Sequence, residues 1–325
     1  MSFVLRRLGF YIVAFFVAAT VNFIIPRLMP GNPVDVMFAQ ATTTIPPEAR
    51  QALIETFGFA TGPLHLQYFD YLKSVFTGDL GYSIRFYPQR VNQVLAYALP
   101  WTLLLAGCAT IIAFAIGSFL GVIAAWRRGG ALDTAITPSS LALQSIPPVV
   151  IAIVALFVFG VILRWLPTGY AYNPRLDPAW SFEFFGSVFY HGLMPITALM
   201  IVFAGGYLVT MRNNMIGQLG EDHVSMGLAK GLTERRVRLN YAARNALLPS
   251  VTSLGLTIGA ILGGSLVTEV VFNYPGLGQT LYIGIVTRDY PLIQGQLLIM
   301  TLATLVANLI VDMIYVLLDP RLRQA

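Results

Sequence analysis

Residues 184–211 read FFGSVFYHGLMPITALMIVFAGGYLVTM and contain no Asp, Glu, Lys or Arg. The run is longer than the roughly 20 residues that an α-helix needs to cross the hydrocarbon core of a bilayer. Water is absent from that core, and a helix lets a single spanning segment pair its own backbone groups. The stretch therefore predicts a transmembrane helix.

The same pattern recurs along the chain. The sequence is 56% hydrophobic and only 11% charged, whereas soluble domains have about a quarter charged residues. Further charge-free windows cover residues 91–126, 134–163, 245–268 and 290–311, and an apolar run covers residues 8–25. We therefore expect an all-α polytopic membrane protein with six transmembrane helices.

The first apolar run also has the basic start of a signal peptide, because Arg6 and Arg7 precede it. Its length exceeds the usual hydrophobic region of such a peptide. This favours an uncleaved anchor, and either interpretation keeps the N-terminus inside.

The distribution of charge predicts the orientation. Six spans place the N-terminus, the loops at 126–133 and 212–244 and the tail from residue 319 on one side. These segments hold twelve Lys or Arg against five Asp or Glu, and the other side holds eight against nine, leaving aside Asp312 in the last span. Cytoplasmic loops carry the excess of Lys and Arg. We expect both termini and the loop 212–244 to be cytoplasmic, and the basic pI needs no nucleic-acid partner.

The most polar stretch of the second half, residues 221–249, reads EDHVSMGLAKGLTERRVRLNYAARNALLP. Asp222 is suited to N-cap a short helix over about residues 223–230, and Gly231 suits the left-handed position after its end. Such a helix is too short to persist alone in water, where roughly 12–15 residues are already marginal. Something else must hold it in place.

The side chains of this short helix suggest how it is held. Val224 and Leu228 share a face at helical spacing, with the flexible Met226 beside them. We expect this face to enter a groove. Thr233 is expected to begin a second helix that runs into the fifth span.

The third span contains Pro138, Pro147 and Pro148. Proline removes a backbone hydrogen bond and kinks a helix, and lipid tolerates this only where neighbours satisfy the freed carbonyl groups. Such a helix lines a pathway in some proteins and reflects plain packing geometry in others. The candidates for a pathway or hinge are Gln144, Pro147, Pro148 and Pro249.

The region between the first two spans, about residues 27–95, is expected to form a small external cap. Thr44 or Pro46 could open a helix there that stops at Gly58. We expect the chain to comprise residues 1–93 with the first helix and cap, residues 94–318 with a five-helix core that includes a coupling loop at 212–246, and a cytoplasmic tail at 319–325.

Several motifs together resemble one known family, the membrane permease subunits of the dipeptide/oligopeptide/nickel branch of ABC importers. They are LRRLGFYIVAFF (5–16), RLMPGNP (27–33), GDLGYS (78–83), GLAKGLTERRV (227–237), RNALLP (244–249), GGSLVTEVVFNYPGLGQ (263–279), RDYPL (288–292) and VDMIYVLLDPRLR (311–323). The resemblance extends over nearly the whole chain. It departs from importer permeases in one place, where Ser225, Met226 and Gly227 replace the Glu-Ala-Ala that opens the cytoplasmic loop motif. A salt bridge from a Glu at position 225 is therefore not expected.

The resemblance implies a type I ABC importer permease fold in a bacterial inner membrane. It also implies that the short cytoplasmic helix is a coupling helix seated in a groove of an ATPase. The residues expected to couple are Glu221, Asp222, Val224, Met226, Leu228, Ala229, Lys230 and Gly231. The implied partners are a second homologous permease, two cytoplasmic ATPase subunits and an external substrate-binding protein. The chain itself would bind no cofactor, since ATP and Mg²⁺ belong to the ATPases, and the cargo would be di- or oligopeptides, or alternatively oligosaccharides or nickel chelates.

Other functions find less support in the residues. Neither Lys73 nor Lys230 has the context of a phosphate-binding P-loop, so nucleotide must bind elsewhere. An ion-coupled carrier predicts ionisable residues at mid-membrane, whereas Glu269 and Asp312 lie near the ends of their spans, where helix packing or an interface accounts for them. His191 has no catalytic partner at a recognisable spacing, which argues against an intramembrane enzyme.

Overall fold

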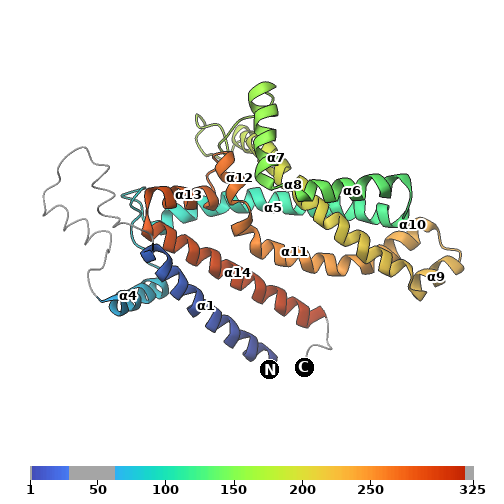
Figure 1. Cartoon of the computed structure of the whole chain (residues 1–325), viewed down its shortest axis with the longest axis horizontal. Helices are drawn as coiled ribbons and strands as arrows, with labels where there is room; N and C mark the ends of the chain where they lie inside the picture. The colour runs from blue at the N-terminus through green and yellow to red at the C-terminus, as the bar shows by residue number, and fades with distance from the viewer. Residues whose placement is uncertain (1, 29–62, 319–325) are drawn as a thin grey trace. The chain divides into compact units, whose positions relative to one another are not determined.

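The computed structural model describes residues 2–28 and 63–318, and within them the secondary structure is helical, with no strand. The elements in chain order are α1 (Ser2–Leu28), α4 (Leu64–Thr77), α5 (Val91–Trp126), α6 (Ala131–Ser145), α7 (Pro148–Ala155), the π-helix η1 (Leu156–Ile162), α8 (Phe182–Leu219), α9 (Asp222–Ala229), α10 (Glu234–Arg236), the π-helix η2 (Val237–Ala243), α11 (Arg244–Gly264), α12 (Leu266–Val271), α13 (Leu277–Thr287) and α14 (Tyr290–Leu318). Figure 1 labels most of them.

Four of the described helices are long and apolar enough to cross a membrane, namely α1, α5, α8 and α14. A fifth span is counted if α6 and the α7–η1 segment, which meet at a bend of 94°, form one broken span. The remaining expected span, the fifth in the chain at residues 245–268, falls on α11 and α12 and is not confirmed as a span. The helix expected between Thr44 or Pro46 and Gly58 lies outside the described residues.

The chain divides into two compact units, residues 1–101 with 275–325 (unit 1) and residues 102–274 (unit 2). In unit 1, α1 packs against α14 and α4 packs against α1 (Figure 1). The Oγ1 atom of Thr20 lies 2.7 Å from the hydroxyl of Tyr68, which fixes α4 on α1.

A buried carboxylate organises another part of unit 1. Asp289 stands between α13 and α14, where its Oδ1 accepts a hydrogen bond from the Leu292 N–H at 3.1 Å and so caps α14. Its Oδ2 accepts hydrogen bonds from the Ser83 hydroxyl and, at 2.9 Å, from the Arg85 N–H. The motifs GDLGYS and RDYPL therefore meet at one side chain.

In unit 2, α8 is the helix against which several others pack. It begins where the Ser181 hydroxyl accepts a hydrogen bond from the Phe184 N–H. A Cβ atom at Gly117 of α5 would lie 2.5 Å from the Ala204 carbonyl oxygen, and one at Gly205 of α8 would lie 2.8 Å from the Ser140 carbonyl oxygen of α6. The glycines allow these backbones to approach closely, as small residues do in membrane helix pairs.

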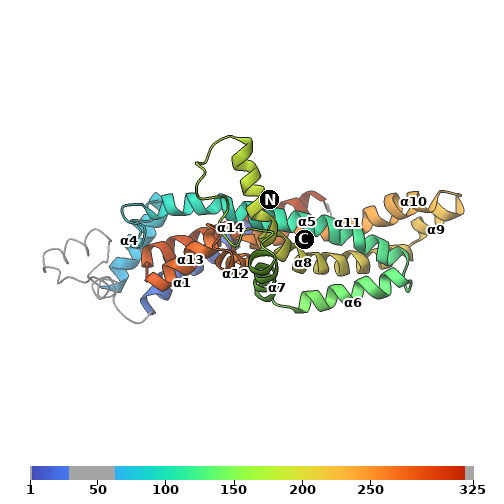
Figure 2. The same cartoon turned by 90° about the horizontal axis from the view of Figure 1, so that it is seen from above.

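The bend between α6 and α7 occurs at Pro147 and Pro148, where the sequence predicts a kink. Pro147 precedes the first residue of α7, Pro148, and the backbone of Ile146 is extended. A residue before proline is forced away from helical geometry, and proline has no N–H to continue a helix. In Figure 1 α6 lies nearly horizontal and α7 nearly vertical. In Figure 2 α7 is seen nearly end-on, along its helix axis. Pro138 and Pro249, by contrast, lie inside α6 and α11 without ending them.

Candidate functional site

The short helix of the polar loop is α9, and its limits differ by one residue from the prediction. It runs over Asp222–Ala229, with Glu221 at the N-cap position. The prediction that Asp222 is the N-cap is wrong, because the backbone N–H groups of Val224 and Ser225 already bond to the Glu221 carbonyl oxygen. The Glu221 side chain makes no capping hydrogen bond, and Asp222 lies in the first turn of the helix.

The other end of α9 follows the prediction. Gly231 has a positive φ of 71°, and its N–H bonds to the Leu228 carbonyl oxygen at 2.9 Å. The Leu232 N–H returns to the Gly227 carbonyl oxygen at 3.3 Å. These two bonds satisfy carbonyl groups at the helix end, and glycine adopts the left-handed backbone without steric cost.

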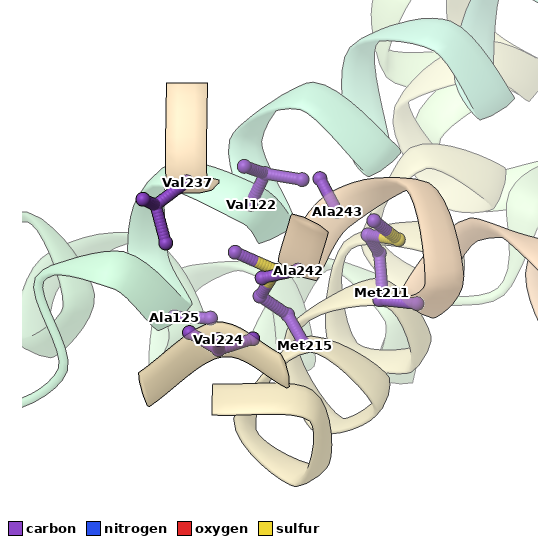
Figure 3. Packing of buried hydrophobic residues seen from close by; sticks show 9 residues of the cluster. Val122, Ala125, Met211, Met215, Val224, Val237, Ala242 and Ala243 are labelled. Atoms are coloured by element: carbon purple, nitrogen blue, oxygen red, sulfur yellow. The ribbon is translucent and has the colours of Figure 1, made fainter. Parts of the chain in front are cut away.

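One face of α9 is buried against other helices of the same chain. Val224 is 2% exposed and belongs to a cluster of buried side chains that we call the α9 cluster. Figure 3 shows Val224 beside Ala125 and Met215. The members of the cluster are Val122 and Ala125 of α5, Met211 and Met215 of α8, Val224 of α9, Val237, Ala242 and Ala243 of η2, and Ala246 of α11.

Contacts of Gly227 and His223 also hold α9 against η2 and α11. A Cβ atom at Gly227 would lie 3.4 Å from Val237, so the backbone of α9 reaches η2 closely at this glycine. The Nε2 atom of His223 lies 3.1 Å from the Asn245 amide nitrogen and 3.3 Å from the Tyr241 carbonyl oxygen. This answers how an eight-residue helix persists: it is packed on four neighbouring elements of unit 2.

The outer face of α9 is open. Met226 is 56% exposed and Leu228 is 49% exposed. Successive residues turn by about 100° on a helix, so Met226 projects almost opposite to Val224, while Leu228 lies at the edge of the buried face. The idea that Val224 enters the same foreign groove as Met226 and Leu228 is wrong, because Val224 is already buried in the α9 cluster.

The other residues expected to couple to an ATPase are exposed, like Met226 and Leu228. They lie in unit 2 and are Glu221, Asp222, Ala229, Lys230 and Gly231. Beyond them Thr233 precedes α10 with an extended backbone, as predicted for the start of the second helix. From there α10, η2 and α11 follow without a break, and a turn at residues 230–233 separates α9 from this continuous helical segment.

An ion pair next to this segment was not foreseen. Arg212 of α8 donates from Nε to Asp133 Oδ1 at 2.6 Å and from Nη2 to Oδ2 at 2.8 Å. Asp133, 5% exposed, also accepts hydrogen bonds from the Gly129 N–H and the Thr137 hydroxyl. A signal was present, because Asp133 directly precedes one charge-free window and Arg212 directly follows another, both on the side expected to be cytoplasmic. The pair ties α6 to α8 one helical turn from the α9 cluster residue Met215.

The candidates for a pathway or hinge are partly brought together. Gln144 lies at the end of α6, and its Nε2 atom would be 3.1 Å from a Cβ atom at Gly206 of α8. Pro147 and Pro148 form the bend that follows. Pro249 lies elsewhere, within α11.

The Glu269 carboxylate is buried in unit 2. It is fully inaccessible and accepts hydrogen bonds from the Thr102 hydroxyl at 2.9 Å and the Ser265 hydroxyl at 2.8 Å. These bonds connect α5 to the junction of α11 and α12. Helix packing therefore explains why Glu269 lies in this position. The sequence alone allows helix packing or an interface as the explanation.

The long apolar helices and the glycine-mediated packing between them define a helical membrane protein with several candidate spans. The chain belongs to the family described as binding-protein-dependent transport system inner membrane component, whose model matches residues 117–324. It is 33% identical to the di/tripeptide transport system permease protein DppB of Pseudomonas aeruginosa (strain UCBPP-PA14) over 99% of both chains. It is 32% identical to the oligopeptide transport system permease proteins OppB of Haemophilus influenzae (strain ATCC 51907 / DSM 11121 / KW20 / Rd) and AppB of Bacillus subtilis (strain 168), again over 99% of both chains.

Proposed function

We propose that this chain is the transmembrane permease subunit of an ATP-driven, binding-protein-dependent importer of di- and oligopeptides. Family membership supports the permease role. The names of relatives that match over 99% of the chain support peptides as the cargo. The chain would supply half of the translocation pathway, and a second homologous permease would supply the other half.

The observation that carries the mechanism is the two-sided character of α9. Val224 and Gly227 are buried against unit 2, while the large apolar side chains of Met226 and Leu228 are exposed. A short helix that is fixed on one face and apolar on the other is suited to enter the groove of a partner. We infer that the partner is a cytoplasmic ATPase, with two such ATPases in the complete importer.

Energy coupling would then be mechanical. ATP-driven closure of the ATPases would displace α9, and the α9 cluster would pass that displacement to α5, α8 and α11, because packed cores resist compression. A partner can shift the equilibrium between inward- and outward-open states only by binding one of them more tightly. ATP and Mg²⁺ would act in the ATPases, and this chain would bind no cofactor of its own.

We propose the type I importer topology of six spans, with α11 and the start of α12 as the span that length and composition leave unconfirmed. The excess of Lys and Arg supports cytoplasmic termini and a cytoplasmic α9. The region before α5, including α4, would form an external cap, where a substrate-binding protein delivers the cargo.

Cross-linking of α9 to the ATPase tests this assignment. The exposed Cys108 is first replaced by alanine. A photoreactive maleimide is then attached at Met226→Cys in the assembled complex, with Gln89→Cys as the control on the opposite expected side. We expect cross-links from position 226 to an ATPase subunit and none from position 89. Cross-links from position 226 to lipid alone would contradict the coupling role.

A further inference from the structure

Two neighbouring hollows open on unit 2 beside the α9 cluster. Their volumes are about 550 Å³ and 350 Å³, which lie in the range of ligand pockets. Phe119 and Val122 of α5 and Leu239 of η2 line both hollows. Because they share this floor, the hollows form one surface, which we call the α5–η2 groove.

The groove combines an apolar floor with a basic rim. Arg244 lines the larger hollow, and Arg127 and Arg238 line the smaller one. Among the described residues none of the three arginines has a carboxylate within ion-pair distance, since the pairs formed are Arg90–Asp79 and Arg212–Asp133. Three positive charges therefore line the two apolar hollows, and no residue of the described part of the chain supplies a counter-charge.

Arg238 is the most constrained of these arginines. Its guanidinium carbon lies 5.9 Å from the centre of the Trp126 ring, close enough for a cation–π contact. Its Nε atom is buried and finds no hydrogen-bond acceptor within the described part of the chain. A buried N–H without an acceptor is costly, so an acceptor from outside the chain would satisfy it.

We propose that the α5–η2 groove binds an anionic phospholipid of the cytoplasmic leaflet. The phosphate would lie among Arg127, Arg238 and Arg244, and an acyl chain would lie along Phe119, Val122 and Leu239. Basic pockets between membrane helices on the cytoplasmic side bind acidic headgroups, and tryptophan marks the membrane interface. A soluble anion would complement the arginines but would leave the apolar floor uncovered, with Phe119 64% exposed.

The position of the groove links the lipid to α9. Val122, Met211 and Ala243 line the larger hollow and are also members of the α9 cluster (Figure 3). A lipid in the groove therefore covers one side of the packing that holds α9. We expect a bound lipid to stabilise the packing of α9 against the α9 cluster. Acidic lipid would then support the coupling of α9 to the ATPase.

Native mass spectrometry tests the site on the full-length chain in nanodiscs of phosphatidylcholine with increasing phosphatidylglycerol. The triple variant Arg127→Gln/Arg238→Gln/Arg244→Gln is compared with Arg235→Gln/Arg236→Gln, which removes two exposed arginines that do not line the groove. At about fivefold in affinity per arginine, we expect the triple variant to bind phosphatidylglycerol about a hundredfold more weakly than a wild-type chain. The control variant should keep the wild-type number of tightly retained lipids.

A second variant separates the apolar floor from the charges. Leu239→Trp keeps the three arginines and fills the shared floor, and we expect it to lose the retained lipid as well. Equal retention in the triple and control variants would overturn the proposal. Displacement of the lipid by glycerol phosphate would reduce the site to a phosphate site and overturn it too. Loss of the lipid on assembly with the second permease would overturn it by showing that the groove is a subunit interface.

Discussion

Val224 and Met226 lie two positions apart on α9, which rotates their side chains by about 200° around the helix axis. Val224 is 2% exposed and Met226 is 56% exposed. Two apolar residues that look equivalent in the sequence therefore differ in purpose. The first stabilises the fold of unit 2, and the second is available to a partner.

Charge substitutions on the two faces of α9 should consequently separate folding from coupling. We expect Met226→Asp and Leu228→Asp to leave the thermal stability of the chain within about 0.5 kcal/mol, as is usual at exposed positions. They should nevertheless abolish ATPase association, because docking would bury an unpaired charge. Val224→Asp should instead destabilise the chain by about 3 kcal/mol or more and reduce its level in the membrane.

Co-purification of the ATPase and a melting curve in detergent measure both effects. Met226→Leu, which keeps an apolar side chain, is the matched control and should retain the ATPase. Normal ATPase binding and uptake in the Met226→Asp and Leu228→Asp variants would refute the docking role of this face.

The Asp133–Arg212 pair makes a second prediction at the scale of residues. Removing one partner of a buried pair leaves an uncompensated charge and typically costs about 3–5 kcal/mol. We expect Asp133→Asn and Arg212→Gln each to destabilise the chain, and the double variant to cost less than the sum by about 1–3 kcal/mol. Unfolding titrations of the four proteins in mixed micelles provide this cycle. Strict additivity would mean that the two side chains are not energetically coupled.

Among the elements, the α6–α7 segment has the clearest local cause. Pro147 and Pro148 stand at its 94° bend, and the extended backbone of Ile146 follows from the proline after it. The packing of α7 on α8 and α12 supports the same bend from outside. Either the two prolines or the packing of α7 on α8 and α12 could be sufficient to set the bend.

A distance measurement on the segment distinguishes these two causes. Spin labels at Thr134 and Val161 should be about 28 Å apart in the bent form, and about 40 Å apart if α6 and α7 joined into a straight helix with a rise of about 1.5 Å per residue. We expect Pro147→Ala/Pro148→Ala to move the distance toward the larger value and to impair uptake. An unchanged distance would show that packing against α8 and α12 sets the bend, with the prolines only compatible with it.

At the scale of the whole chain, the long spans were predictable because a run of about 20 or more uncharged, mostly apolar residues is typical of a membrane-spanning helix. The bend was predictable from Pro147 and Pro148, and the end of α9 from Gly231, because the backbone limits of proline and glycine are local. Local sequence did not reveal that Val224 faces inward. That depends on η2 and α5, which supply Val237 and Val122 from distant positions.

The same reason accounts for the remaining differences. Asp133 and Arg212 are far apart in the sequence, and their pairing requires α6 and α8 to be neighbours. Asp222 resembled an N-cap by residue type, but the backbone of Glu221 begins the helix one position earlier. The bonds of Glu269 to Thr102 and Ser265 likewise arise from the packing of α5 on the α11–α12 junction.

We propose that ATP hydrolysed by partner subunits, and not an ion gradient, drives transport through this chain. The most direct measurement is uptake of labelled di- and oligopeptides into liposomes that contain the chain, its second permease, the ATPase pair and the binding protein. We predict that import requires ATP in the compartment of the ATPases and continues when ionophores abolish proton and sodium gradients. Gradient-driven uptake by the purified chain alone, without ATP or partners, would contradict the claim and identify a secondary carrier.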